Sequence, residues 1–193
     1  MRRNVALLLF DEVEVLDFAG PFEVFAVTDE LAGHAVFNVY TVAENIGTIR
    51  ARNGLKVIPD YSRENCPAPQ VLIVPGGYGT RALLHKPALL EWVRQRAGRA
   101  ELVLSVCTGA LVLGQAGLLD GLRATTHHEC LDLLRTTAPR AEVVATERFV
   151  DEGRIVTAAG ISAGIDASLH VVSRLIGAEA ADRTARCMEY RRP

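Results

Sequence analysis

Three continuous apolar runs divide the chain, and each has the length of a buried strand. They lie at residues 5–10, 71–74 and 102–106. A strand that is covered by helices on both faces reads as a continuous apolar run, whereas a half-exposed strand alternates between apolar and polar residues. Residues 35–43 alternate in this second way. The pattern predicts a sheet whose central strands are buried on both faces.

Apolar positions at helical spacing follow most of these runs. Pro21 suits a first helical position, so we expect a helix to begin there and to end near Leu31. The other expected helices lie at residues 83–96, 110–119, 165–176 and 178–189, with one more opening at 127–130. Shorter strands are expected at residues 55–58, 123–126, 142–145, 148–150 and 154–158. Strands that alternate with helices predict an α/β fold with a mostly parallel sheet, in a single domain of residues 1–193.

Cys107 stands where the apolar run 102–106 gives way to an apolar helix. A sharp strand-to-helix turn projects its side chain away from the sheet, as in a nucleophile elbow. The N–H groups of the following helix then favour thiolate over thiol. A small buried hydrophobic residue is the alternative interpretation of a free cysteine.

Two further strand ends carry chemistry that complements a thiol. The first strand leads to Asp17, and the run 71–74 leads directly to Pro75, Gly76 and Gly77. Because ligands bind at the carboxyl ends of parallel strands, we expect the carboxylate, the glycines and the thiol to meet. Asp17 is alternatively a helix N-cap or a first-turn acid, and the glycines are alternatively a tight turn rather than an oxyanion hole.

Two polar residues near the cysteine have two interpretations each. Thr108 either caps a helix with its hydroxyl or directs its hydroxyl and N–H at a substrate. His127 either orients a polar group near Cys107 or caps the helix that begins at Glu129.

Composition and charge exclude several classes of partner. The chain has 193 residues, 49% of them hydrophobic, and a formal net charge of −2. This balance gives no electrostatic reason to expect nucleic acid, and no window is apolar for long enough to span a membrane. Arg2 and Arg3 lead directly into a strand without a signal peptide, so we expect a cytoplasmic protein.

No cofactor and no metal are expected. The four cysteines are widely spaced without a C-x-x-C pair, so we interpret them as reduced thiols. Residues 127–130 (HHEC) diverge around a helix too strongly to share one metal ion. No G-x-G-x-x-G follows the first strand, which argues against a dinucleotide.

Five motifs together resemble the DJ-1/PfpI superfamily, and more narrowly its isonitrile hydratase branch. They are LDFAGPFE at 16–23, VPGG at 74–77, SVCTGA at 105–110, ATTH at 124–127 and AGISAGID at 159–166. The resemblance implies a flavodoxin-like three-layer α/β/α sandwich, a reactive Cys107 and a homodimer. It implies that Asp17 faces the thiol, with Glu23 as a second candidate acid. Protease-like members have histidine after the cysteine, whereas this chain has Thr108, so we do not expect a peptidase.

The resemblance leads to one principal hypothesis and two alternatives. The first is hydration of isonitriles to N-substituted formamides through a thioimidate on Cys107, with Asp17 as general acid and base and an apolar small-molecule pocket lined by Phe18 and Tyr78. The second is a ligand sensor related to AraC-type regulators. The third is a glyoxalase or deglycase that acts on 2-oxoaldehydes with His127 as proton shuttle.

Overall fold

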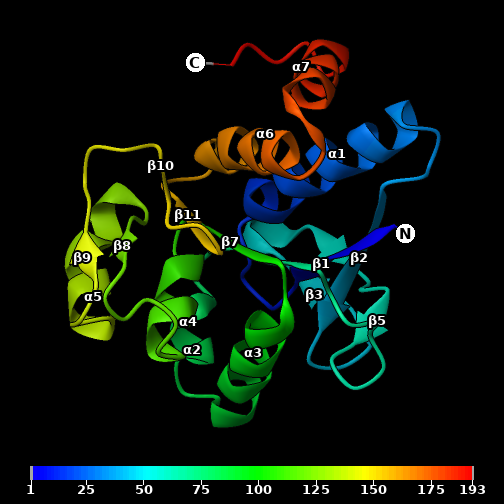
Figure 1. Ribbon diagram of the computed structural model, residues 1–193. Helices are drawn as coiled ribbons and strands as arrows, with labels where there is room; N and C mark the ends of the chain where they lie inside the picture. The colour runs from blue at the N-terminus through cyan, green and yellow to red at the C-terminus, as the bar shows by residue number, and fades with distance from the viewer. Residues whose placement is uncertain (1, 193) are drawn as a thin grey trace.

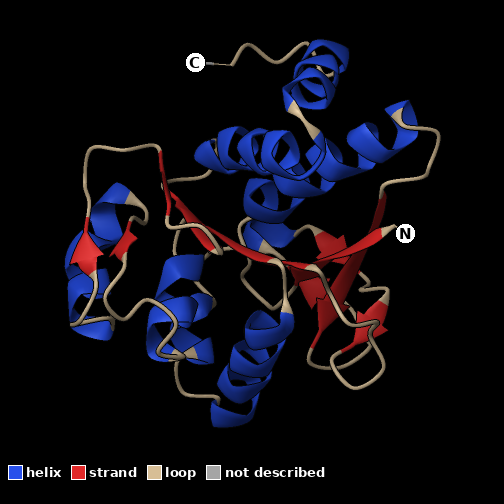
Figure 2. Cartoon of the chain, viewed as in Figure 1, coloured by secondary structure: helices blue, strands red, loops and turns tan. Residues whose placement is uncertain are grey.

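A seven-stranded β-sheet runs through the middle of the molecule (Figures 1 and 2). The computed structural model describes residues 2–192. The strand order is β10-β11-β7-β6-β1-β2-β5, and every neighbouring pair is parallel except β10 and β11. The strands are β1 Arg3–Leu8, β2 Phe37–Ala43, β5 Tyr61–Ser62, β6 Val71–Val74, β7 Leu102–Val106, β10 Phe149–Asp151 and β11 Ile155–Ala158.

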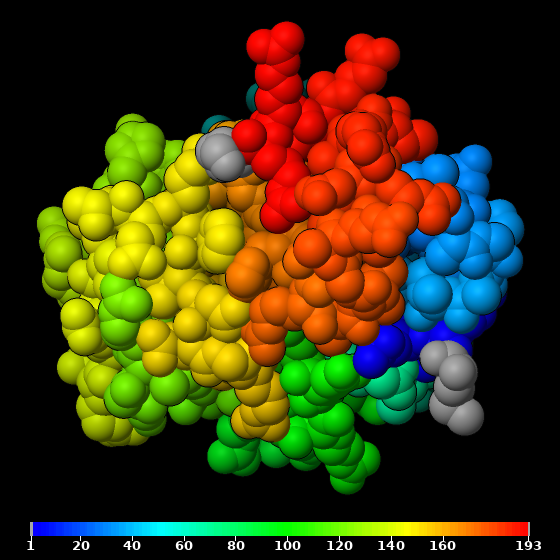
Figure 3. Space-filling model, turned by 45° about the horizontal axis from the view of Figure 1, so that its top comes forward, coloured from blue at the N-terminus to red at the C-terminus, as the bar shows by residue number. Residues whose placement is uncertain are grey.

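Helices cover both faces of this sheet and form the outer layers of a sandwich (Figure 1). On one face α1 packs against α6 and α7, and the orange and red C-terminal helices dominate the view in Figure 3. On the other face α4 contacts α2, α3 and α5. The helices are α1 Val15–Leu31, α2 Thr80–Leu83, α3 Pro87–Arg99, α4 Gly109–Gln115, α5 Leu131–Thr137, α6 Ala163–Ile176 and α7 Ala178–Cys187. This arrangement confirms the predicted flavodoxin-like α/β fold.

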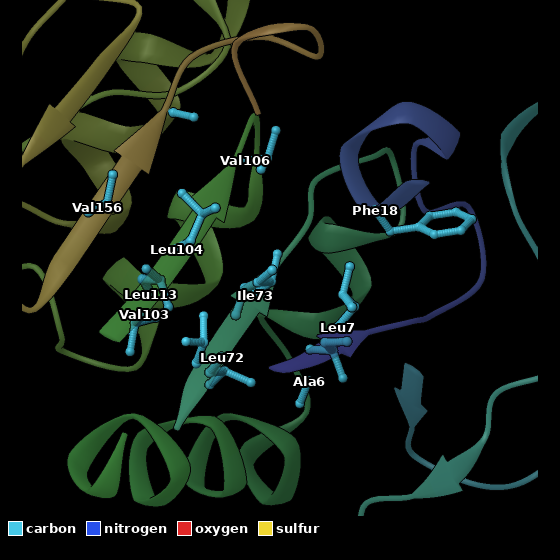
Figure 4. Packing of buried hydrophobic residues seen from close by; sticks show 14 of the residues in the cluster. Ala6, Leu7, Phe18, Leu72, Ile73, Val103, Leu104, Val106, Leu113 and Val156 are labelled. Atoms are coloured by element: carbon cyan, nitrogen blue, oxygen red, sulfur yellow. The ribbon is translucent and has the colours of Figure 1, made fainter. Parts of the chain in front are cut away.

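The central strands are buried on both faces, as their continuous apolar runs predicted. Every residue of β6, β7 and β11 is buried, and Figure 4 shows side chains of β1, β6 and β7 packed together in the core. Full burial of one aliphatic side chain stabilises the fold by roughly 1.5–3 kcal/mol. Burial of apolar side chains on both faces of these strands therefore holds the two helix layers against the sheet.

The register of the parallel strands brings their carboxyl ends to one edge. Val74 at the end of β6 lies beside Ser105 of β7, and Ala158 at the end of β11 lies beside Val106. The segments that follow β1, β6, β7 and β11 consequently leave the sheet at the same edge. Those segments contain the candidate site residues.

Helix α1 begins six residues earlier than expected. It starts at Val15 and includes Pro21, which was predicted to open it. Proline inside a helix loses the N–H that would bond to the carbonyl four residues earlier, here Asp17. The buried residues of α1, among them Phe18, Val24 and Phe25, pack into the core and hold the helix across this missing bond. Asp17 therefore lies in the first turn, as one of its two interpretations predicted.

A second helix begins later than expected. The helix expected at 83–96 corresponds to α3, which begins at Pro87, while α2 ends at Leu83; Lys86 before α3 has a non-helical conformation (φ −109°, ψ 84°). The residue before a proline is driven away from helical dihedrals, and Pro87 begins α3.

Four short strands lie outside the main sheet. Strands β3 Ile49–Arg50 and β4 Lys56–Val57 pair antiparallel around a 3₁₀ turn at Arg52–Gly54, and β8 Arg123–Ala124 pairs parallel with β9 Glu142–Val143. A second 3₁₀ turn, His128–Cys130, precedes α5. Within residues 2–192, no helix combines the length and apolar character that crossing a membrane requires.

Candidate functional site

Cys107 occupies a strained turn between β7 and α4. Its φ is 54°, in the left-handed region that non-glycine residues rarely adopt. A Cβ on Gly109 would lie 2.0 Å from the carbonyl oxygen of Val74, so only glycine fits where the chain turns back over β6. The backbone N–H of Cys107 donates to Ala159 O at 2.8 Å, and its carbonyl accepts from Thr126 Oγ1 at 2.7 Å. The predicted sharp strand-to-helix elbow at Cys107 is confirmed, and its role as nucleophile stays a prediction.

Two backbone N–H groups interact with the Cys107 sulfur. They belong to Thr108, the next residue, and to Ile161, in the loop before α6, and both lower the pKa of the thiol. Ile161 has a φ of 41°, which is a rare conformation for a β-branched residue. The loop therefore holds Ile161 in a strained conformation beside the sulfur.

Asp17 is completely buried beside this thiol. Its Oδ2 accepts a hydrogen bond from the N–H of Gly76 at 3.0 Å. Its Oδ1 is also buried and accepts no hydrogen bond of ordinary geometry within residues 2–192. The Cys107 thiol nevertheless acts on the carboxyl group as a hydrogen-bonding neighbour that lowers its pKa. The structure thus places a thiol and a carboxyl oxygen with spare acceptor capacity side by side.

Burial raises the pKa of both groups, and the charge of Asp17 raises that of Cys107 further. Burial raises the pKa of Asp17 to about 7, with a smaller contribution from the charge of Glu14, against the opposing Gly76 and Cys107 hydrogen bonds. Burial and then the Asp17 charge raise the pKa of Cys107, and these effects outweigh the two N–H groups. The N–H group at the helix start favours the thiolate, as expected, but burial and the charge of Asp17 outweigh it. Above neutral pH the pair instead shares one proton and one negative charge.

Gly76 and Gly77 serve the site through their lack of side chains. A Cβ on Gly76 would meet Thr108 N at 2.5 Å and Asp17 Oδ2 at 2.8 Å. Gly77 has a φ of 126°, and its N–H donates to Thr108 Oγ1 at 2.9 Å. Both N–H groups are thus engaged within the protein. They hold Asp17 and Thr108 in place and are not the free oxyanion donors that we expected.

Thr108 connects the turn at Cys107 to the turn at Gly76 and Gly77. Its hydroxyl lies 3.1 Å from Gly77 O and accepts from Thr80 Oγ1 at 3.2 Å. It makes no capping hydrogen bond to α4, although it occupies the N-cap position. The capping role is therefore wrong. Thr108 lines the cavity above Cys107, and its role toward a substrate stays a prediction.

His127 has the capping role that one of its two interpretations predicted, and it also lies near Cys107. Its Nδ1 accepts from the N–H of Glu129 at 3.3 Å, so it caps the 3₁₀ turn. Its ring lies against Gly160, where a Cβ would be 2.7 Å from Cδ2, and it lines the same cavity as Cys107. Burial and then the neighbouring His128 lower its pKa.

A cavity of about 220 Å³ opens above the thiol, and its lining is mainly polar. Tyr78 lies at its rim with 66% of its surface exposed. Phe18 is buried in the core and does not line this cavity, so the predicted apolar pocket of Phe18 and Tyr78 is wrong (Figure 4). Phe18 follows Asp17 on α1, and a helix directs adjacent side chains to different sides. Because Asp17 faces the thiol, Phe18 cannot.

Glu23 does not take part in the site. It is exposed on α1, six residues after Asp17. Six residues correspond to about one and two-thirds helical turns, which places the two carboxyl groups on different sides of the helix. Asp17 is the buried acid beside Cys107.

Several residues that line the cavity were not predicted as site residues from the sequence. They are Glu14, Arg52, Arg81, Cys130 and Ile161. Only the glycine-spaced segment 160–164 carried a signal, since a turn rich in glycine and small residues favours strained backbone. The charged residues come from segments without any motif. A larger cavity of about 430 Å³, beside Phe10 and Ile46, contains none of the residues that touch the thiol.

Comparison with known proteins identifies the fold and the family. The DJ-1/PfpI family model matches residues 3–174, which is most of the chain. The chain belongs to the DJ-1/PfpI family. A crystal structure of a ThiJ/PfpI family protein from Pseudomonas syringae matches with a TM-score of 0.88 and 31% identity, over 100% of this chain and 77% of that one.

Relatives of this DJ-1/PfpI chain include both an enzyme and regulators. It is 37% identical over 190 residues to an isonitrile hydratase of Pseudomonas putida, covering 98% of this chain and 79% of the hydratase. It is 29% identical over 191 residues to the HTH-type transcriptional regulator GbdR of Pseudomonas aeruginosa, covering 98% of this chain and 51% of the regulator. The chain therefore spans about half the length of that regulator.

Proposed function

We propose that this protein hydrates isonitriles to N-substituted formamides without a cofactor. The observation that carries the proposal is the buried Asp17, whose pKa of about 7 and open Oδ1 suit it to move a proton at Cys107 near neutral pH. The similarity to an isonitrile hydratase over nearly the whole chain supports the same choice of reaction.

In the first step Cys107 adds to the terminal carbon of the isonitrile. Asp17, as carboxylate, takes the thiol proton while the S–C bond forms, and then delivers that proton to the same carbon. The product is a thioimidate, R–N=CH–S–Cys107. The N–H groups of Thr108 and Ile161 stabilise the negative charge that develops on sulfur before the bond is complete.

In the second step water replaces the sulfur. Asp17 accepts a proton from water as the oxygen attacks the thioimidate carbon, and it passes this proton to the nitrogen. The C–S bond of the tetrahedral intermediate then breaks, and the remaining hydroxyl proton returns through Asp17 to the sulfur. One isonitrile and one water give one formamide, and Cys107 and Asp17 return to their starting states.

A second candidate reaction is favoured by the position of His127. This residue lines the cavity with the thiol, and its lowered pKa keeps the imidazole neutral and able to accept a proton. A hemithioacetal of Cys107 with a 2-oxoaldehyde needs such a base to move a proton between adjacent carbons. The same site therefore suits a glyoxalase.

A side-by-side turnover assay separates these functions. Purified protein is incubated with para-substituted phenyl isonitriles and with methylglyoxal, using Cys107→Ala as control. The proposal expects formamide that disappears in Cys107→Ala and falls roughly a hundred- to ten-thousand-fold in Asp17→Asn. Loss of methylglyoxal without formamide would instead support the glyoxalase. Binding without turnover of either compound would support a ligand sensor.

A further inference from the structure

We propose that Arg81 binds an anionic group of the substrate, so that the natural substrate is a small electrophile that carries a carboxylate. This inference deepens the proposed function and rests on its choice of Cys107 as nucleophile. Arg81 lies in α2, which follows the glycine turn, and its side chain lines the cavity above Cys107.

The charge of Arg81 is not balanced by a carboxylate. Within residues 2–192 its guanidinium donates to Gly77 O at 3.3 Å, Thr80 Oγ1 at 3.4 Å and Cys130 Sγ at 3.3 Å. The two bonds to oxygen are longer than the usual range for N–H···O bonds, and none of the three acceptors is a carboxylate. The guanidinium is partly buried, where a charge without a counter-ion is costly.

The other charges of the cavity have partners or face water. Arg52 lies 3.8 Å from the carboxylate of Glu14. Glu129 has 75% of its side chain exposed and lies 3.9 Å from His127. Arg81 is therefore the cation of the cavity wall that a ligand is best placed to neutralise.

Arg81 is also held in an orientation that suits a planar anion. The centre of the Tyr78 ring lies 5.4 Å from its guanidinium carbon, and both terminal nitrogens donate hydrogen bonds within the protein. A guanidinium that is fixed in this way binds a carboxylate through two parallel hydrogen bonds. A cavity of about 220 Å³ limits the ligand to a small molecule, with its reactive carbon at Cys107 and its anionic end at Arg81.

Alkylation of Cys107 tests this inference without any isonitrile. Each of the four thiols is mapped by mass spectrometry after reaction with iodoacetate or its neutral analogue iodoacetamide, in which sulfur displaces iodide. A longer pair, N-iodoacetylglycine and N-iodoacetylglycinamide, places the carboxylate farther from the sulfur. The exposed Cys187 serves as internal reference for the intrinsic rates.

For at least one pair, we expect the ratio of the alkylation rate with the anionic reagent to that with the neutral reagent to be roughly tenfold higher at Cys107 than at Cys187. A charge-assisted hydrogen bond is worth about that factor. Arg81→Gln should abolish the preference, Arg81→Lys should retain part of it, and Arg94→Gln, an exposed arginine of α3, should leave it unchanged. The ratio of paired reagents cancels any change in thiol reactivity.

Two results would overturn the inference. One is an equal anionic preference at Cys107 and Cys187, and the other is a preference that survives in Arg81→Gln. A change confined to Cys130 alkylation would show that Arg81 serves that thiol alone and would also overturn it. Turnover of 4-isocyanobenzoate and phenyl isonitrile then tests the proposed function separately, because the alkylation ratio does not depend on hydration.

Discussion

The raised pKa of Asp17 predicts that the fold becomes less stable as this carboxyl group ionises. A carboxyl group whose pKa rises on folding favours the native state only while it is protonated. Its pKa rises from 3.8 to about 7, which is about three units at about 1.4 kcal/mol each. The resulting penalty begins near pH 4, is complete above about pH 7, and reaches about 4 kcal/mol as an upper limit.

Asp17→Asn should therefore stabilise the protein while it removes activity. Asparagine keeps an acceptor for the N–H of Gly76 but cannot ionise. Its gain in the free energy of unfolding over wild type should grow between pH 4 and pH 8. Urea denaturation at both pH values measures this difference. The exposed Asp132→Asn is the control, and an equal gain in both variants would contradict the assignment of the raised pKa.

The proposed first step predicts how activity depends on pH. It requires Asp17 as carboxylate to take the thiol proton, and its pKa is about 7. We expect kcat/KM for an isonitrile to rise through about pH 7 and to fall roughly tenfold per unit below it. Initial rates between pH 5.5 and 8.5 measure this profile. A profile that stays flat across pH 7 would exclude Asp17 as the base.

Gly76→Ala should damage the site because its Cβ would overlap both Thr108 N and Asp17 Oδ2. The displaced carboxyl group could no longer reach the sulfur, so we expect formamide production to fall at least about a hundredfold. Gly98→Ala is the matched control, since a Cβ there meets nothing within 4 Å. It lies in helix α3 and should increase stability by up to about 1 kcal/mol with normal activity. Equal activity of both variants would disprove the positioning role of Gly76.

At the scale of elements, the site depends on loops that neighbouring helices hold in place. Arg148 and Tyr190 both bond to the buried Asp166 in the first turn of α6, and Arg148 also donates to Ser162 at 3.3 Å. Ser162 is the neighbour of Ile161, whose N–H faces the thiol. The C-terminal segment is therefore tied to the same helix start that supports the site.

Tyr190→Phe should loosen this connection with little effect on chemistry. It removes the 2.8 Å hydrogen bond to Asp166 Oδ1, and loss of a bond to a charged group costs about 1.5–3 kcal/mol. We expect this decrease in the free energy of unfolding together with a kcat close to wild type. Tyr61→Phe, whose hydroxyl makes no hydrogen bond to residues 2–192, should change stability by less than about 0.5 kcal/mol. Similar losses in both variants would contradict a role for the Asp166 bond.

At the scale of the whole molecule, we propose a homodimer from the family resemblance. Ile46, Leu55 and Ile58 are large apolar side chains that are exposed near β3 and β4. Exposed apolar groups that lie close together are typical of interaction surfaces. This surface is thus a candidate contact between two copies.

Sedimentation at micromolar concentration tests the dimer. We expect a species of twice the 20.9 kDa chain mass, and Ile58→Arg should shift it toward the monomer because a buried charge would lack a partner. Lys56→Arg, a charge-conserving change on β4, is the control. A wild-type protein that sediments only at 20.9 kDa would refute the proposal.

The local pattern of the chain determined most of the architecture. Continuous apolar runs predicted β6 and β7 correctly because burial on both faces leaves no polar positions in a strand. The ends of the strands also predicted which residues meet, since parallel strands present their carboxyl ends at one edge. Asp17, Gly76 and Cys107 each follow such a strand end in the sequence. These features depend on neighbours in sequence and on sheet geometry alone.

Tertiary structure decided how the assembled groups behave. Helix α1 continues through Pro21 because core packing outweighs one lost hydrogen bond. In this helix Asp17 lies on a buried side and Glu23 lies on the surface. The raised pKa values of Asp17 and Cys107 come from the exclusion of water, which no local pattern records. Arg81 reaches the cavity from a segment without a motif. Charge and solvation at the site depend on residues distant in sequence, and only the folded chain brings them together.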